Sequence, residues 1–188
     1  MTSIDKPVNI GVIHGRFQIL HNDHMKYLMA GKNLCNHLIV GITNPDPTLT
    51  KDSNANPHRS KTSSNPLTFY ERHVMIREAL LEVGLQLSEF SIVPFPINFP
   101  ELLKYYVPLD AMFFLSIYDD WGKQKKTFLE SLGLNIHVLW KLPLEKKGIS
   151  GRDLRDLMVK GGEWQHLVPK SVINFIEKND IIDRLKLL

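Results

Sequence analysis

The chain has 188 residues, 43% of them apolar, which predicts one domain over residues 1–188 with a sizeable core. The net charge of +3 is spread along the chain and does not by itself indicate nucleic acid. A single cysteine, Cys35, excludes an internal disulfide and no Cys/His cluster has zinc-ligand spacing. The start MTSIDKPVN lacks the features of a signal peptide, and no apolar run approaches the roughly 18 residues of a membrane span. We therefore expect a cytoplasmic protein with no membrane partner.

Apolar, β-rich runs alternate with helical patterns along most of the chain. The expected strands cover residues 8–14, 37–42, 91–95, 111–117 and 135–140. The expected helices cover residues 23–34, 67–83, 100–106, 120–132, 151–160 and 169–179. Such alternation predicts a Rossmann-like α/β fold with a doubly wound parallel sheet over residues 1–145, followed by a helical C-terminal cap over 146–188. In such sheets, ligands bind at the carboxyl ends of the strands.

Residues 15–24, with the sequence GRFQILHNDH, join the first strand to the first helix. Asn22 and Asp23 are good N-cap candidates, so the turn is expected at a helix N-terminus, where unpaired N–H groups and a positive dipole end attract anions. His21 and His24, three residues apart, would lie on one helical face. Together with Arg16, they suit phosphate chemistry.

This stretch resembles the first motif, G-R-F-Q-P-x-H-x-G-H, of the nucleotidyltransferase superfamily that contains the nicotinamide-mononucleotide adenylyltransferases. The chain departs from the motif at Ile19, where the family has Pro, and at Asp23, where it has Gly. N-capping is the favoured role of Asp23; the alternatives are holding an imidazole in one tautomer or helping to bind Mg²⁺.

The stretch ISGRDLR at residues 149–155 is similar to the family's second motif, I-S-x-T-x-x-R, with Arg152 in place of Thr. Ser150 and Asp153 fit a capping box, so a helix is expected to begin at residue 150 with its first N–H groups available to the β- and γ-phosphates. By resemblance, Ser150 and Arg155 bind the triphosphate, and Arg152 adds a cation. The alternative is a plain capped helix with surface arginines.

The resemblance implies transfer of a nucleoside monophosphate from a triphosphate to an acceptor phosphate, with release of pyrophosphate and no covalent enzyme intermediate. It assigns His21, His24 and Arg16 to the reacting phosphates, beside the phosphate-binding residues Gly15 and Phe17. Catalysis would come from positioning and from neutralising charge. Mg²⁺ is expected as cofactor, carried by the triphosphate without a dedicated protein cage.

A third stretch, NPLTFYER at residues 65–72, resembles the family's N-P-F-T-x-x-E-R and makes Arg72 another phosphate-binding candidate; its alternative is a surface ion pair. The long, polar segment 43–66 contains Asn44, His58 and Arg59. It suggests a lid over the acceptor, although a solvated basic loop is an equally good interpretation.

Candidates for the nucleoside or the acceptor follow two further strands. Asp119, Asp120 and Trp121 come after the strand at 111–117, where a carboxylate can accept from ribose hydroxyls and an indole can stack on a ring. The alternative has Asp120 capping a helix and Trp121 in the core. Asn98 is a weaker candidate of the same kind, and Trp140 and Trp164 are expected in the core.

Substrate choice is less constrained than the reaction class. The combination of GRFQILHNDH, ITNPDP and YDDW is similar to a side branch associated with phosphonate natural-product biosynthesis, whose members attach CMP from CTP to a small phosphonate such as phosphonoformate. The alternatives are synthesis of NAD from ATP and nicotinamide mononucleotide, and a nucleotide-binding regulator without catalysis. A homo-oligomer is left open.

Overall fold

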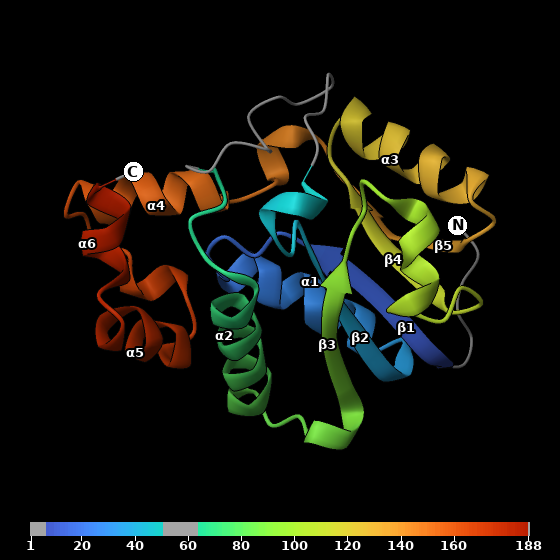
Figure 1. Cartoon of the computed structure of the whole chain (residues 1–188), viewed down its shortest axis with the longest axis horizontal. Helices are drawn as coiled ribbons and strands as arrows, with labels where there is room; N and C mark the ends of the chain where they lie inside the picture. The colour runs from blue at the N-terminus through green and yellow to red at the C-terminus, as the bar shows by residue number, and fades with distance from the viewer. Residues whose placement is uncertain (1–6, 51–63, 188) are drawn as a thin grey trace.

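In the computed structural model of the chain, residues 7–50 and 64–187 are described, and they form an α/β fold around a five-stranded sheet (Figure 1). All neighbouring strands are parallel, in the order β3-β2-β1-β4-β5. The strands are β1 (Val8–Gly15), β2 (Cys35–Thr43), β3 (Phe90–Phe95), β4 (Met112–Ile117) and β5 (Asn135–Lys141).

Six α-helices occur in the described ranges, together with short 3₁₀ segments. The α-helices are α1 (Asn22–Lys32), α2 (Phe69–Glu82), α3 (Asp120–Ser131), α4 (Gly151–Val159), α5 (Lys170–Lys178) and α6 (Ile181–Lys186). The 3₁₀ segments are η1 (Pro47–Leu49), η4 (Leu87–Glu89), η5 (Pro100–Tyr105), η6 (Leu144–Lys146) and η7 (Gln165–Leu167). None of the helices in these ranges is long and apolar enough to cross a membrane.

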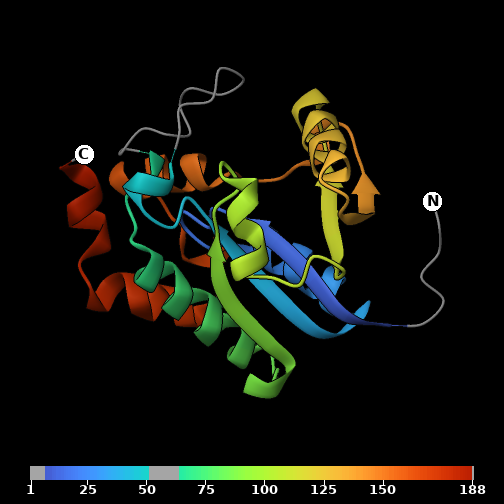
Figure 2. The ribbon, with the colours of Figure 1, turned by 45° about the vertical axis from the view of Figure 1, so that its right-hand side comes forward.

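The sheet is covered on both faces, as its continuous apolar strands require. Val12 and Ile13 are adjacent on β1 and fully buried, and they belong to two different apolar clusters. The Ile13 cluster includes Leu28 of α1, Met75 of α2 and Val172 of α5. The Val12 cluster holds, on the other face, residues from η5 and α3. Figure 2 shows α3 on the opposite side of the sheet from α2 and α5.

The strand order creates a switch point beside β1. From β1 the chain winds outward through β2 to β3, then crosses back to β4 on the other side of β1 and continues to β5. The connections after β1 and β4 therefore diverge, which opens a crevice at their carboxyl ends where ligands bind in this class of fold. Residues 15–24 leave β1 at this place.

The predicted α/β class and parallel sheet are confirmed. Three local expectations are corrected. The predicted helix at 100–106 is the 3₁₀ segment η5, helix α6 was not predicted, and the N-cap of α1 is His21, in place of Asn22 or Asp23. His21 has an extended backbone and its side chain makes no capping hydrogen bond, so the propensity of Asn and Asp for N-caps did not decide where this helix begins.

Candidate active site

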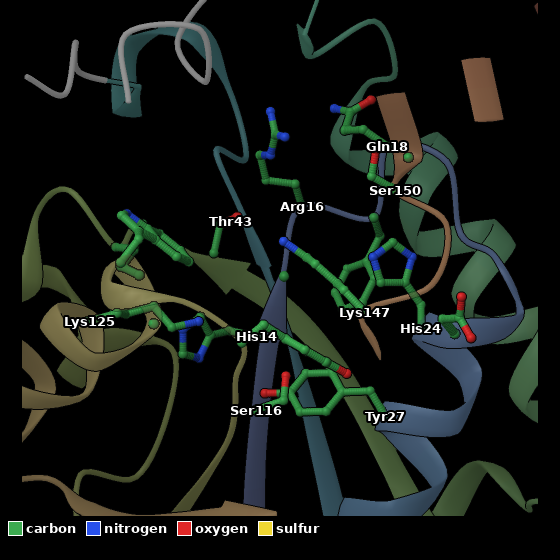
Figure 3. A pocket seen from close by; sticks show the side chains of 18 of the residues that line it. His14, Arg16, Gln18, His24, Tyr27, Thr43, Ser116, Lys125, Lys147 and Ser150 are labelled. Atoms are coloured by element: carbon green, nitrogen blue, oxygen red, sulfur yellow. The ribbon is translucent and has the colours of Figure 1, made fainter. Parts of the chain in front are cut away.

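A cavity of about 700 Å³ lies at the carboxyl ends of the strands, at the switch point (Figure 3). Its wall includes six predicted site residues on or near the first turn and α4: Gly15, Arg16, Phe17, His21, His24 and Ser150. It also includes Asn44, Asn98, Asp119 and Trp121. Residues from the beginning, middle and end of the chain thus meet around one space.

His21 and His24 form a stacked pair at the start of α1. Their ring centroids are 3.7 Å apart, and the Phe17 ring meets His24 edge-on at 5.1 Å. Burial lowers the pKa of His21 to about 4, against the opposing effect of Asp23. Burial, together with the charges of His21 and Arg16, lowers the pKa of His24 well below its usual value. Both imidazoles are therefore neutral at pH 7 before an anion arrives, and each can donate one N–H.

The turn that carries these histidines is clamped by buried polar contacts. The Gln18 side chain donates Nε2–H to the Leu67 carbonyl and accepts the Leu67 N–H, at 3.0 and 2.9 Å. Arg155 of α4 donates to the Gln18 carbonyl and, at 3.0 Å, to that of Gly151. The two later motifs thus hold the first motif in place, one through the Gln18 side chain and the other through the Gln18 carbonyl.

Arg72 is positioned differently from the prediction. It is 1% exposed, does not line the cavity, and donates hydrogen bonds of 2.8 to 3.5 Å to main-chain carbonyls. The acceptors are the carbonyl oxygens of Arg16, Thr43, Asn44, Pro45 and Thr68. A guanidinium has five N–H groups, so this set engages all of them. Arg72 therefore organises the loops after β1 and β2 and leaves no donor to a phosphate.

Arg152 and Arg155 also lie outside the cavity wall. Arg155 is 8% exposed and faces the first motif, whereas Arg152 is exposed and 3.9 Å from Asp156 on the outer side of α4. The direction of a helical side chain depends on how the helix packs, and the motif spacing does not contain that information. The predicted triphosphate contacts of both arginines stay a prediction, since neither side chain lines the cavity in this structure.

The N-terminus of α4 does face the cavity. The predicted capping box is present, because Ser150 Oγ accepts the Asp153 N–H at 3.2 Å and Asp153 accepts the Ser150 N–H at 3.1 Å. A Cβ at Gly151 would lie 2.6 Å from the Gln18 carbonyl oxygen, so only glycine allows α4 to approach the first motif this closely. The first N–H groups of α4 are thereby brought beside the histidine pair.

Asp23 does not cap α1, which corrects the favoured interpretation. Its Oδ1 accepts from Lys26 at 2.8 Å, and its Oδ2 accepts the Ile149 N–H at 3.1 Å. Each oxygen of the carboxylate therefore accepts one hydrogen bond from the protein. Asp23 joins the first motif to the loop that precedes α4.

The two aspartates after β4 have different positions. Asp119 is the N-cap of α3 and accepts the Gly122 N–H at 2.8 Å, whereas Asp120 is exposed, pairs with Lys123 at 2.7 Å and does not line the cavity. Capping thus falls to Asp119, one residue before the aspartate considered for it. Trp121 lies on the cavity wall and not in the core.

His58 and Arg59, in the 43–66 segment, lie outside the described residues. Asn44 is buried at the end of β2, with a φ of 49°, and its carbonyl accepts from Arg72 at 2.8 Å. Asn98 follows β3 and lines the same cavity.

Sequence reasoning missed several residues of the cavity wall. Lys147 projects between the turn and β1 in Figure 3, 6.0 Å from the Tyr118 ring centroid. Tyr118 accepts the Trp140 Nε1–H at 2.7 Å, so Trp140 is an aromatic wall residue, whereas Trp164 is buried as predicted. The other missed wall residues include His14, Tyr27, Thr43, Ser116 and Lys125. Thr43 and Tyr118 belong to the ITNPDP and YDDW stretches, which were used above without assigning these two residues to the site. For His14, Ser116 and Lys125 the only available signal was their place at a strand end or on the following helix.

Residues 12–157 match the profile of the family described as cytidylyltransferase-like. The chain belongs to this family. This cytidylyltransferase-like chain is 44% identical over 184 residues to phosphonoformate cytidylyltransferase from Streptomyces viridochromogenes, covering 98% of this chain and 99% of that protein. It is 31% identical over 179 residues to nicotinamide-nucleotide adenylyltransferase from Thermococcus onnurineus, covering 95% and 87% of the two chains.

A solved structure of a bifunctional NMN adenylyltransferase/ADP ribose pyrophosphatase from Francisella tularensis, complexed with AMP and a manganese ion, shares the fold at a TM-score of 0.60 and 13% identity. The match covers 96% of this chain and 56% of that one, so this cytidylyltransferase-like chain spans about half of the bifunctional protein. The sequence relationships make the chain a nucleotidyltransferase. This sets aside the interpretation as a regulator without catalysis.

Proposed function

We propose that this nucleotidyltransferase transfers CMP from CTP to the phosphonate group of phosphonoformate. The observation that carries the proposal is the 44% identity to phosphonoformate cytidylyltransferase over almost the full length of both chains. The similarity to nicotinamide-nucleotide adenylyltransferases is lower, about 30%, and supports a second candidate, AMP transfer from ATP to nicotinamide mononucleotide.

In the proposed reaction, a phosphonate oxygen of the acceptor attacks the α-phosphorus of CTP. The new bond joins that oxygen to the α-phosphorus, the bond from the α-phosphorus to the α–β bridging oxygen breaks, and pyrophosphate leaves with the bonding electrons. The attacking oxygen is already an anion at neutral pH, so no general base is required. The protein's task is to align two anions that repel each other and to stabilise charge on the α-phosphate and the leaving group.

The phosphate groups have a natural orientation in this cavity. The N-terminus of α4, with Ser150 and Gly151, offers N–H groups and a positive dipole end to the β- and γ-phosphates. The stacked His21 and His24 would then face the α-phosphate, and Arg16 and Lys147 would add positive charge from the cavity wall. Neutral imidazoles can donate N–H groups without the cost of holding two buried charges beside each other.

The nucleoside has an aromatic wall available on the β4–β5 side. Tyr118 and Trp140 are joined by their hydrogen bond, and Tyr27 meets Trp140 edge-on at 6.0 Å. Aromatic rings provide broad apolar area with polar edges, which suits a base and ribose.

Mg²⁺ is part of the proposal as the partner of the triphosphate. No group of three or more His, Cys, Asp or Glu side chains suited to a metal occurs in residues 7–50 and 64–187, and each Asp23 oxygen accepts one hydrogen bond from the protein. The ion would therefore be held by phosphate oxygens and water, and it would supply charge neutralisation. Excess chelator should abolish pyrophosphate release, and added Mg²⁺ should restore it.

We also propose a cytoplasmic location, where nucleoside triphosphates are available, and retain a homo-oligomer as a proposal.

The proposed product is directly detectable. Incubation of the full-length protein with CTP, phosphonoformate and Mg²⁺ should give one equivalent of pyrophosphate and a compound with the mass of CMP joined to phosphonoformate, with a phosphorus–phosphorus coupling in the ³¹P spectrum. Hydrolysis of CTP to CMP, or the absence of any acceptor-dependent product, would contradict the proposal.

A further inference from the structure

His14 is a buried imidazole on the cavity wall with no hydrogen-bond partner in the described chain. It is the second-last residue of β1 and 4% exposed, and both of its ring nitrogens are unpaired. Its ring stacks on Phe95 with a centroid distance of 4.5 Å and an angle of 7° between the planes. An imidazole has at least one donor and usually one acceptor, and a buried polar group without a partner is costly. A partner supplied by the ligand would remove that cost.

The position of His14 relative to the phosphate sites limits what this ligand group can be. In Figure 3, Ser150 at the N-terminus of α4 and His14 lie on opposite sides of Lys147 and His24. An in-line displacement places the nucleophile opposite the leaving group. If pyrophosphate leaves toward α4, the acceptor approaches from the side of His14.

The charge around His14 favours an anion. Figure 3 shows the Lys125 side chain of α3 extending toward the imidazole, and both residues line the cavity. Burial and the Lys125 charge lower the pKa of His14 well below its usual value. Asp119 also lines the cavity, and its Oδ1 accepts the Gly122 N–H. The aromatic wall of Tyr118 and Trp140 lies on the β4–β5 side, whereas Phe95 holds His14 toward β3.

We propose that His14 and Lys125 bind the carboxylate of the acceptor, so that this pair selects carboxylated phosphonates over phosphonates without a second anionic group. His14 would donate one N–H to a carboxylate oxygen, and the Lys125 ammonium would neutralise the charge. The Phe95 ring would fix the orientation of the imidazole. This inference rests on the proposed function, because it requires the acceptor to be a carboxylated phosphonate.

The test compares two acceptors that differ in the carboxylate. The kcat/KM for phosphonoformate divided by that for methylphosphonate gives a selectivity ratio. If methylphosphonate is not turned over, its inhibition constant divided by the KM of phosphonoformate serves as the ratio. The His14→Phe variant keeps a planar ring on Phe95 but removes both nitrogens, and we expect it to lower the ratio about 10- to 100-fold, the scale of a hydrogen bond to a charged group. His14→Gln, which retains an N–H, should recover part of the loss.

Lys125→Met should lower the same ratio, whereas its matched control Lys123→Met should not, since Lys123 pairs with Asp120 outside the cavity. Melting temperature and the dissociation constant of CTP identify any variant that is merely misfolded. Equal losses with both acceptors in His14→Phe would overturn the inference and leave the proposed function intact. Failure of the unmodified protein to use phosphonoformate with any triphosphate would overturn the proposed function, and this inference with it.

Discussion

The carboxylate of Asp23 accepts the main-chain N–H of Ile149 at 3.1 Å, and this one hydrogen bond joins the helix of the histidine pair to the loop that opens α4. Gly148, with a φ of 73°, makes the contact possible, because a Cβ there would lie 2.3 Å from Asp23 Oδ2. Partial burial opposes ionisation of Asp23, but the hydrogen bonds from Lys26 and Ile149 outweigh it and lower the pKa of the carboxyl. An acid beside a phosphate site is tolerable here because both of its oxygens are engaged.

Removal of the Asp23 carboxylate should therefore weaken triphosphate binding. We expect Asp23→Ala to lower kcat/KM for the nucleoside triphosphate about 10-fold, since the loop that carries Ser150 loses an anchor worth about 1 to 2 kcal/mol. Asp23→Asn, whose amide oxygen can still accept the Ile149 N–H, should retain most of the activity. Asp183→Ala is the matched control, because Asp183 forms the same type of exposed pair with Lys186 at 2.8 Å. Equal kinetics for Asp23→Ala and this control would contradict the assigned role.

His24 is expected to act on the α-phosphate. His24→Ala should lower kcat at least about 100-fold, the effect of deleting a preorganised donor to developing negative charge, with little change in melting temperature. Steady-state pyrophosphate release measures this loss. The exposed His166 provides the control variant His166→Ala. A His24→Ala enzyme with nearly full turnover would remove that histidine from the reacting phosphates.

Arg72 is expected to contribute to the stability of the fold and not directly to triphosphate binding. Arg72→Met leaves buried carbonyls without donors, and we expect it to lower the free energy of unfolding by about 2 to 4 kcal/mol. Arg77, about one turn further along α2, is half-exposed and pairs with Glu78, so Arg77→Met should cost less than about 1 kcal/mol. Urea unfolding compares the two. A normally stable Arg72→Met protein with a raised KM for the triphosphate would instead support the predicted phosphate contact.

The neutral, buried His21 should make the protein less stable in acid. Its pKa is about 4 in the folded chain against an ordinary value of 6.5, so between these values the unfolded state binds more protons. The contribution of neutral His21 to the free energy of unfolding is fully present above pH 6.5. It is lost as the pH falls toward 4, at up to about 1.4 kcal/mol per pH unit. Unfolding free energies at pH 7.5, 6.0 and 5.0 should show a smaller decline for His21→Gln than for the unmodified protein. An unchanged pH dependence would indicate that His21 is protonated in the folded protein.

The sequence predicted those features that local patterns encode. Alternating elements indicated the parallel sheet, and the Ser150–Asp153 capping box is present as predicted. Side-chain direction was not predictable for Arg72 and Arg155, because it depends on which face of each helix packs inward. Single residues such as His14 and Lys147 carry no pattern, and only the tertiary structure brings them to the cavity. Helix α3 begins at Asp120, as expected, and its N-cap is therefore the preceding residue, Asp119.

The most direct test of the central claim is acceptor-dependent pyrophosphate release, measured with ATP, CTP, GTP and UTP, each paired with phosphonoformate and with nicotinamide mononucleotide. We expect CTP with phosphonoformate to have the highest kcat/KM of the eight pairs. Phosphonoformate without CTP should release no pyrophosphate. A preference for ATP with nicotinamide mononucleotide would contradict the account and identify the chain as an adenylyltransferase that makes NAD.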